Sequence, residues 1–222
     1  MKTRLMIFDL DGTVLDTVTT IAHFCNEALI KYGLKTFPVE RYKYFAGEGA
    51  KKLTENILTA QNAYNEDLHI KLFDYYMESY DKTPAYLTTI FKGLKETLDE
   101  LKKMGIKIAI VSNKPHFATL SVTEELYGKG YFDLIFGQRE NVPLKPDPTA
   151  VLETVSHFKV KKEECIYVGD TSTDMITGKN AGIYTVGVLW GFRDENELLE
   201  NGADKVIKSP EELLELGIRN EG

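Results

Sequence analysis

Short, mostly apolar runs recur along the chain, and most of them end at a small or polar residue. The runs span residues 5–8, 106–111, 134–136, 165–168 and 184–189. A strand that is buried on both faces has no polar side to alternate with, so runs of this kind are typical of parallel sheets. We therefore expect five buried strands at these positions.

The segments between these runs have apolar residues at helical spacing. Leucines lie three or four residues apart between residues 94 and 101, and the pattern stops near Gly105. The segments 148–158 and 174–182 behave similarly, and the second ends on a glycine, as a helix C-cap often does. Strand and helix patterns alternate from residue 93 to the end, which predicts an α/β fold with a Rossmann-like parallel sheet.

The stretch from residue 16 to residue 83 interrupts this alternation. Its pattern is helical throughout, most clearly over residues 21–30 and 65–80, and Pro84 marks its end. We interpret residues 16–83 as an all-helical cap domain inserted into a catalytic core formed by residues 1–15 and 84–222. The alternative is an elaborated first crossover that packs against the sheet.

Acidic residues follow two of the predicted strands. Asp9 and Asp11 come after the first run, and Asp170 and Asp174 come after the run that ends at residue 168. Reactive groups in such sheets gather beyond the carboxyl ends of the strands, so we expect these side chains to converge. Converging carboxylates repel one another unless a cation lies among them, and oxygen ligands suit Mg²⁺. The sequence therefore predicts a magnesium site.

Residues that can hold an anion lie near the same strand ends. Ser112 follows the 106–111 strand and precedes Asn113, and Lys145 lies in a proline-rich loop. Gly12 permits a tight turn, after which Thr13 could offer its amide to an anion. Taken singly, Ser112 would be explained as a helix N-cap and Lys145 by a structural ion pair. Together with the carboxylates, they indicate chemistry on an anionic group.

Composition narrows the class of protein further. The 222 residues include 34 acidic and 27 basic side chains, a formal charge of -7, and 43% are hydrophobic. These values are typical of a globular protein, and the acidic excess argues against nucleic-acid or anionic-membrane partners. The first apolar run stops at Asp9, too early for a signal peptide or membrane span, so we expect a cytoplasmic protein. Cys25 and Cys165 are expected to be buried, reduced thiols.

Four motifs in this order resemble those of the haloacid dehalogenase-like phosphatase superfamily. They are Asp9-x-Asp11-Gly12-Thr13, Val111-Ser112-Asn113, Lys145-Pro146 and Gly169-Asp170-x-x-x-Asp174. The insert after the first motif is similar to the helical cap of the first cap class in this superfamily. Residues 169–191 and the cap stretch Gly47-Glu48-Gly49 look most like members of the phosphoglycolate phosphatase type.

The resemblance implies a role for each motif residue. Asp9 would be the nucleophile that forms an aspartyl-phosphate, and Asp11 would be the general acid and base. Mg²⁺ would be held by the Asp9 carboxylate, the Asp11 carbonyl and Asp170, with Asp174 bound directly or through water. The residues expected to bind phosphate are Thr13, Ser112, Asn113 and Lys145. Counted formally, the four carboxylates, Lys145 and Mg²⁺ leave one negative charge, which protonation of Asp11 would remove.

These expectations describe a Mg²⁺-dependent phosphatase, monomeric or homodimeric, that acts on a small phosphomonoester similar to 2-phosphoglycolate. Asp11, Asp170 and Asp174 argue against a dehalogenase, which needs neither this acid nor a metal. A sugar phosphomutase of the β-phosphoglucomutase type, a pyrophosphate or nucleotide phosphatase, and a non-enzymatic phospho-acceptor signalling module remain alternatives. Three further residues are candidates for substrate contact, with a solvated or surface-packing role as the alternative: Glu48, Lys51 and Arg193.

Overall fold

The core of the molecule is a six-stranded sheet in the order β5–β4–β1–β6–β7–β8. The computed structural model of the chain describes residues 2–83 and 85–218, so the expected boundary at Pro84 lies outside the described residues. Every neighbouring pair of strands in this sheet is parallel. The strands are β1 (Leu5–Phe8), β4 (Lys107–Pro115), β5 (Leu134–Gln138), β6 (Cys165–Gly169), β7 (Tyr184–Val188) and β8 (Lys205–Ile207). The five predicted strands are confirmed, and β8 is an addition.

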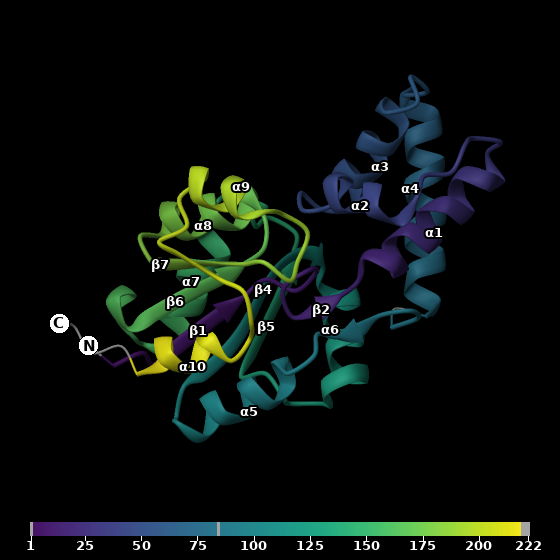
Figure 1. Ribbon diagram of the computed structural model, residues 1–222. Coiled ribbons are helices and arrows are strands. Elements are labelled where there is room, and N and C mark those ends of the chain that lie inside the picture. Colours follow the sequence, from purple (N-terminus) through teal and green to yellow (C-terminus); the bar gives the residue numbers. More distant parts are fainter. Residues whose placement is uncertain (1, 84, 219–222) are drawn as a thin grey trace.

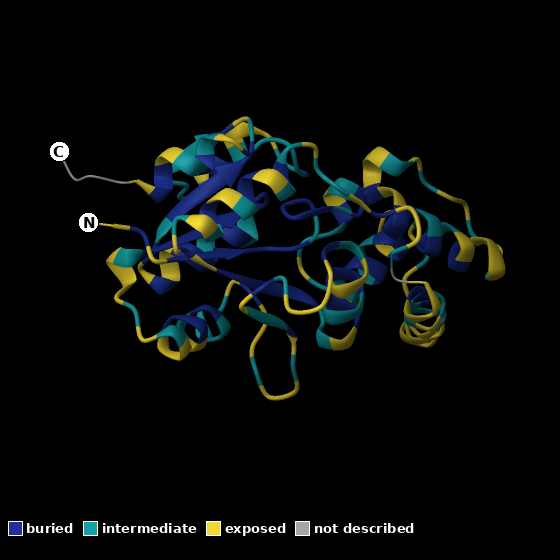
Figure 2. Ribbon diagram, turned by 90° about the horizontal axis from the view of Figure 1, so that it is seen from below, coloured by how far each residue is buried: buried dark blue, intermediate teal, exposed yellow. Residues whose placement is uncertain are grey.

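Strand β1 lies at the centre of the sheet, and all four of its side chains are fully buried. Because side chains alternate along a strand, Met6 and Phe8 pack into one hydrophobic cluster and Leu5 and Ile7 into another. Burying each of these side chains contributes about 1.5–3 kcal/mol. Figure 2 shows the strands as buried ribbons, with the exposed residues on the outward sides of the helices.

Helices cover both faces of the sheet, as Figure 1 shows. The cluster that contains Met6 and Phe8 takes side chains from α5 (Leu94–Lys103), α6 (His116–Tyr127) and α10 (Glu212–Gly217). The cluster on the other face takes them from α7 (Thr149–Phe158) and α8 (Ser172–Ala181). A 3₁₀ turn (Lys162–Glu164) precedes β6, and α9 (Glu195–Glu200) connects β7 to β8. The α/β fold class predicted from the alternating pattern is therefore confirmed.

Residues 18–82, which we call the helical segment, form four helices to one side of the sheet (Figure 1). They are α1 (Val18–Lys31), α2 (Val39–Phe45), α3 (Ala50–Thr59) and α4 (Glu66–Lys82). Their apolar faces, including Phe24, Ile57 and Leu72, form a hydrophobic cluster separate from those of the sheet. The chain leaves the sheet through β2 (Leu15–Asp16) and returns through β3 (Thr89–Ile90), and these two short strands pair antiparallel.

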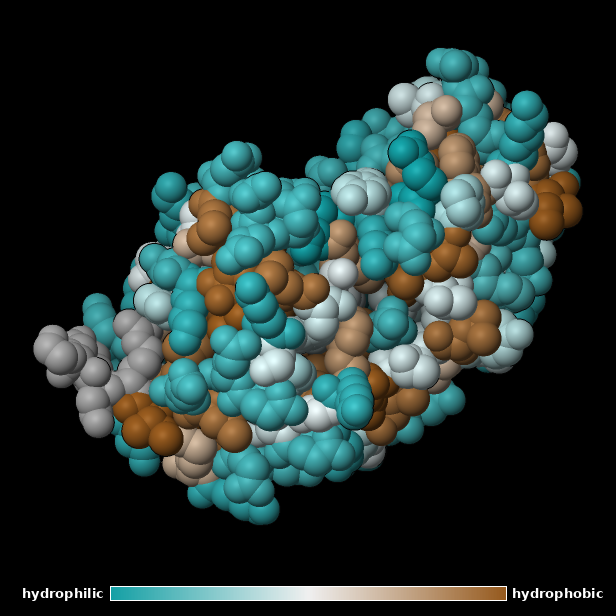
Figure 3. Space-filling model, in the orientation of Figure 1, coloured by the Kyte–Doolittle hydropathy of each residue, from teal (hydrophilic) through white to brown (hydrophobic). Residues whose placement is uncertain are grey.

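The outer surface of the molecule is largely hydrophilic on the face drawn in Figure 3, and its outline is indented between the helical segment and the sheet. No described helix combines the length and the hydrophobicity that a membrane crossing requires. Cys25 and Cys165 are both buried and unpaired thiols, as expected from the sequence.

Candidate active site

The first acidic motif forms a tight turn directly after β1. The Asp9 amide donates to the Val168 carbonyl at 2.9 Å, which fixes the start of the turn against β6. Gly12 has a φ of +86°, and a Cβ atom at this position would lie 2.2 Å from Oδ2 of Asp170. Only glycine combines this backbone conformation with so close an approach. The turn therefore brings the first and last acidic motifs into contact.

Three buried carboxylates meet beyond the ends of β1 and β6. Oxygen atoms of Asp9, Asp170 and Asp174 lie within 4.8 Å of one another. Burial, together with the negative charges of Asp174 and Asp11, raises the pKa of Asp9 from its ordinary 3.8 to about 7, although Lys145 opposes this shift. Burial and the neighbouring carboxylates also raise the pKa of Asp170 well above its ordinary value. We call these three residues the carboxylate cluster.

Lys145 binds two members of the carboxylate cluster. Its Nζ donates to Oδ1 of Asp9 at 2.6 Å and to Oδ1 of Asp174 at 2.7 Å. Asp174 also accepts from the Tyr167 hydroxyl at 3.0 Å, the Thr171 hydroxyl at 2.7 Å and the Thr171 amide at 3.1 Å. Burial disfavours its charge, but Lys145 and these hydrogen bonds together lower the pKa of Asp174. Asp174 is therefore a fixed anion that anchors Lys145.

The remaining oxygens of the carboxylate cluster suit a divalent cation. Within the described residues, Oδ2 of Asp9 accepts no hydrogen bond. Each oxygen of Asp170 accepts one: Oδ1 from the Thr13 hydroxyl at 2.7 Å and Oδ2 from the Phe192 amide at 2.8 Å. Three carboxylates opposite one ammonium leave a formal charge of two negative. Oxygen donors with unused lone pairs and this net charge fit an ion such as Mg²⁺.

Thr13 holds Asp170 in place. Its hydroxyl donates to Asp170, and its amide donates to the Leu10 carbonyl at 3.2 Å. The Thr13 carbonyl accepts from the indole nitrogen of Trp190 at 3.0 Å. The amide that the sequence suggested for an anion is thus engaged within the turn. The hydroxyl acts on the carboxylate cluster instead.

The second motif lies on β4, which continues through Ser112 and Asn113 to Pro115. The Ser112 hydroxyl oxygen accepts from the Lys114 amide at 3.2 Å, so its proton can be directed toward an oxygen in the cavity that this serine lines. The Asn113 carboxamide accepts from the Lys145 amide at 2.8 Å and donates to the Lys145 carbonyl at 3.1 Å. It also donates to the Gly47 carbonyl of the helical segment at 3.3 Å. Asn113 therefore positions the Lys145 loop.

Lys114 is a buried cation that the sequence analysis did not identify as a site residue. Its Nζ contacts both carboxylate oxygens of Asp11 at 3.2 Å and lies 4.2 Å from the ring centre of Tyr80 in α4. Although burial opposes its charge, Asp11 and Tyr80 raise the pKa of Lys114, which remains an ammonium. Strand alternation was the available signal, because it places Lys114 on the same side of β4 as Ser112.

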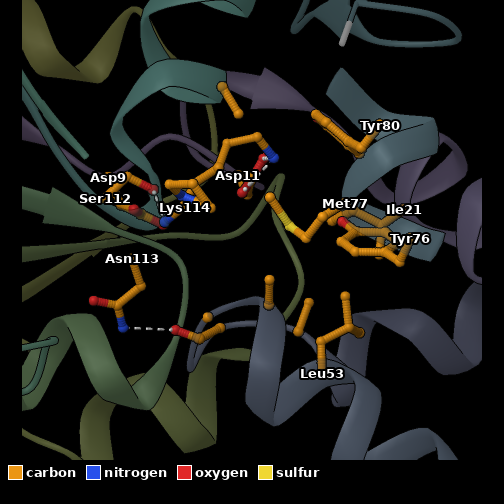
Figure 4. Close-up of a pocket in the computed structure, with 16 residues that line it drawn as sticks. Asp9, Asp11, Ile21, Leu53, Tyr76, Met77, Tyr80, Ser112, Asn113 and Lys114 are labelled. Carbon is orange, nitrogen blue, oxygen red and sulfur yellow. Dashed lines mark hydrogen bonds and ion pairs between the residues drawn. The ribbon is translucent and has the colours of Figure 1, made fainter. Parts of the chain in front are cut away.

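A cavity of about 50 Å³ lies between the sheet and the helical segment. The sheet side supplies polar groups, from Asp9, Asp11, Ser112, Asn113 and Lys114. The facing wall is mostly apolar and includes Ile21, Leu53, Tyr76, Met77 and Tyr80. Figure 4 shows Lys114 and Asp11 pointing toward each other between these two walls. The predicted nucleophile, Asp9, and the predicted acid, Asp11, therefore line the same cavity as the apolar side chains of the helical segment.

The three residues expected to contact the substrate from the cap or its border lie outside the lining of this cavity. Glu48 is flanked by two glycines that do line it. The Lys51 ammonium lies 5.8 Å from the ring centre of Phe73, in a separate surface depression. Arg193 donates to the carbonyls of Lys43 and Ala46 and pairs with Glu197 at 3.0 Å, so it joins the core to the helical segment.

Comparison with known proteins agrees with this geometry. Residues 6–188 match the family model described as haloacid dehalogenase-like hydrolase. A phosphoglycolate phosphatase of Aquifex aeolicus is 32% identical over 96% of both chains, and one of Vibrio parahaemolyticus is 30% identical over 96% of this chain and 95% of its own. A solved candidate phosphoglycolate phosphatase of Lactobacillus delbrueckii subsp. bulgaricus superimposes with a TM-score of 0.94 at 28% identity, over 99% of this chain and 100% of that chain. These matches confirm the resemblance predicted from the motifs: the chain belongs to the haloacid dehalogenase-like hydrolase family.

Proposed function

We propose that this enzyme, a phosphoric monoester hydrolase, is a Mg²⁺-dependent phosphatase that acts on a small substrate similar to 2-phosphoglycolate. The observation that carries the proposal is the placement of Asp9, a buried carboxylate that lines the cavity beside Asp11 and is held by Lys145. The phosphoglycolate phosphatases among its relatives support the substrate class.

In the first step, a carboxylate oxygen of Asp9 attacks the phosphorus atom. The bond between phosphorus and the ester oxygen breaks, and Asp11 donates a proton to the departing alcohol. The products of this step are the free alcohol and an aspartyl-phosphate on Asp9. Asp11, now ionised, lies in the same cavity and remains beside Lys114.

In the second step, the aspartyl-phosphate is hydrolysed. Asp11 takes a proton from a water molecule, whose oxygen attacks phosphorus and displaces the Asp9 carboxylate. Inorganic phosphate leaves, and both aspartates return to their starting states. One group can serve as acid and then as base because the first transfer leaves it ionised.

The other residues hold the phosphoryl group during both steps. The Ser112 hydroxyl and the Lys145 ammonium donate to phosphoryl oxygens, while Asn113 and Asp174 fix the position of Lys145. Asp9, the Asp11 carbonyl and Asp170 would hold Mg²⁺, and the ion would supply positive charge that offsets the negative charge of the phosphoryl oxygens. Because both oxygens of Asp174 already accept hydrogen bonds, contact with the ion through water fits this residue better than direct coordination.

The helical segment acts as a cap in this proposal, and residues 16–83 form the cap domain. Its helices supply one wall of the cavity, so its closure would exclude bulk water while the ester bond breaks. The mostly apolar wall that the helical segment supplies favours a short alcohol group over the hydroxyl-rich sugar that a phosphomutase must retain and turn around. A cytoplasmic location and a monomeric or homodimeric state remain predictions.

Release of inorganic phosphate from 2-phosphoglycolate tests the proposal. Wild-type protein should require Mg²⁺, lose activity in EDTA and recover when Mg²⁺ is restored. Asp9→Asn should reduce turnover to background, whereas Asp67→Asn, in an exposed ion pair with Lys71 on α4, should retain it. Full activity of the Asp9→Asn protein would refute the proposed nucleophile. Interconversion of sugar phosphates without phosphate release would favour the phosphomutase.

A further inference from the structure

The cavity contains a cation, Lys114, to which the proposed mechanism assigns no contact with the phosphoryl group. Lys145 makes two short hydrogen bonds, at 2.6 and 2.7 Å, within the carboxylate cluster. Lys114 lies beside Asp11, and both of its contacts with that carboxylate are 3.2 Å long. Charge-assisted hydrogen bonds between nitrogen and oxygen are usually about 2.7–2.9 Å. The ammonium of Lys114 is therefore buried but loosely held, and its three N–H groups can serve a further acceptor.

The second observation is the hydroxyl of Tyr80, on the opposite wall of the cavity. Tyr80 is 2% exposed, and its ring lies against the ammonium of Lys114. Burial raises the pKa of Tyr80, while the adjacent ammonium of Lys114, which can only donate to the hydroxyl oxygen, opposes this shift. Among the described residues the hydroxyl proton of Tyr80 has no acceptor. Leaving a buried hydroxyl without a partner is unfavourable, so a ligand acceptor at this position would satisfy it.

The rest of the facing wall defines what else can bind. Ile21, Leu53 and Met77 offer only apolar contact. An anionic ligand group would thus find its donors at Lys114 and Tyr80. The ester oxygen of a bound substrate must lie next to Asp11, whose carboxylate is 3.2 Å from Lys114. A group one or two bonds from the ester carbon therefore reaches the ammonium.

We propose that Lys114 and Tyr80 form a recognition site for a carboxylate on the alcohol part of the substrate. One carboxylate oxygen accepts from the ammonium and the other from the phenol. The preferred substrates are then phosphomonoesters of short hydroxy acids. This inference rests on the proposed phosphatase function. Because β4 supplies Lys114 and α4 supplies Tyr80, the site is complete only when the helical segment covers the ends of the strands.

The test compares two monoesters that differ in this carboxylate, 2-phosphoglycolate and ethyl phosphate. The readout is the ratio of their kcat/KM values, because Lys114→Met also removes the partner of Asp11 and should slow both reactions. The ratio should fall by roughly tenfold to a hundredfold in Lys114→Met and by about tenfold in Tyr80→Phe, mainly through a higher KM for 2-phosphoglycolate. Lys82→Met, in an exposed pair with Glu78 on α4, should leave the ratio unchanged.

The outcomes separate this inference from the proposed function. If wild-type protein releases phosphate from neither monoester, the phosphatase proposal fails and the carboxylate site fails with it. If it hydrolyses ethyl phosphate as efficiently as 2-phosphoglycolate, the phosphatase stands and the carboxylate site is overturned. Equal losses on both monoesters in Lys114→Met would show that this lysine acts only on Asp11. A fall in the ratio for Lys51→Met, and not for Lys114→Met, would assign recognition to Lys51. Tyr80→Phe removes a single buried hydroxyl and keeps the test available if Lys114→Met fails to fold.

Discussion

Asp9→Asn should stabilise the metal-free protein at pH 8, although it removes the proposed nucleophile. Asp9 is buried near Asp170 and Asp174, and its pKa is about 7 in the folded chain, compared with an ordinary value of 3.8. At low pH the residue is protonated in both the folded and the unfolded chain. Between about pH 4 and 7 the unfolded chain loses this proton while the folded chain keeps it, so the contribution of Asp9 to stability falls as pH rises.

The size of the effect follows from this difference in pKa. Each pKa unit corresponds to about 1.4 kcal/mol, so ionised Asp9 costs the folded state about 4 kcal/mol at pH 8. Asparagine avoids this cost but loses about 1 kcal/mol through a weaker hydrogen bond with Lys145. The variant should therefore be about 3 kcal/mol more stable than wild type at pH 8. The extra stability of the variant should decrease by about 3 kcal/mol when the pH is lowered from 8 to 5, because pH 5 lies two units below the pKa of Asp9 in the folded chain.

Urea unfolding followed by circular dichroism measures this effect, in EDTA and in Mg²⁺, at pH 5 and pH 8. Mg²⁺ should stabilise wild-type protein more than the variant, because it compensates the charge that the variant lacks. Asp67→Asn, whose side chain is 80% exposed, should change stability by less than about 1 kcal/mol at both pH values. If Asp9→Asn changes stability by the same amount at both pH values in EDTA, the argument from burial and carboxylate repulsion is wrong.

Three further predictions concern the supports of the site. In Gly191→Ala the new Cβ would lie 2.4 Å from Cβ of Asp170, so the free energy of unfolding in urea should fall by about 1–3 kcal/mol. Mg²⁺ should also stabilise this variant less than it stabilises wild type. Thr171→Ala removes a helix N-cap and a hydrogen bond to Asp174, at a cost of about 1–2 kcal/mol in the same assay, and Thr171→Ser should recover most of it. Arg193→Ala leaves two carbonyls of the helical segment without their donor, so amide hydrogen exchange should accelerate at residues 43–53 and stay unchanged in β1. An equal acceleration at residues 43–53 and in β1 would contradict this role.

The fold was predictable where burial leaves a simple pattern. Strands β1 and β6 are buried on both faces, and their apolar runs marked them in the sequence. Strand β8 has only three residues and begins with Lys205, so no run distinguishes it. Helix α6 buries alanine, threonine, valine and tyrosine but no leucine, and it therefore lacks the stripe that identified α5. Strand β8 and helix α6 form where they do because they pack against the sheet, and this packing depends on the tertiary structure rather than on a local sequence pattern.

The site was predictable to the extent that its residues follow strands in short motifs. Asp9, Asp170 and Asp174 converge because β1 and β6 are adjacent, and parallel strands place their carboxyl ends together. Strand alternation places Lys114 on the same side of β4 as Ser112, but it does not reveal a partner, because Asp11 lies 103 residues earlier and no local pattern connects the two. The two carbonyls to which Arg193 donates likewise lie about 150 residues away, in the helical segment. Contacts of this kind depend on how the helical segment sits on the sheet, which motif spacing does not encode.

Lys114 also changes the electrostatic account of how an acidic protein binds a phosphate ester. With Lys145 alone, the four carboxylates and Mg²⁺ left one negative charge, and protonation of Asp11 was needed for neutrality. With Lys114 included, the same four carboxylates lie among two ammoniums, and a bound Mg²⁺ would bring the formal charge to zero. When Asp11 holds the proton that the proposed mechanism assigns to it, the charge of Lys114 is no longer compensated within the protein. A carboxylate on the substrate would then compensate it, so the form with protonated Asp11 is the one best suited to a ligand that carries a carboxylate in addition to its phosphate.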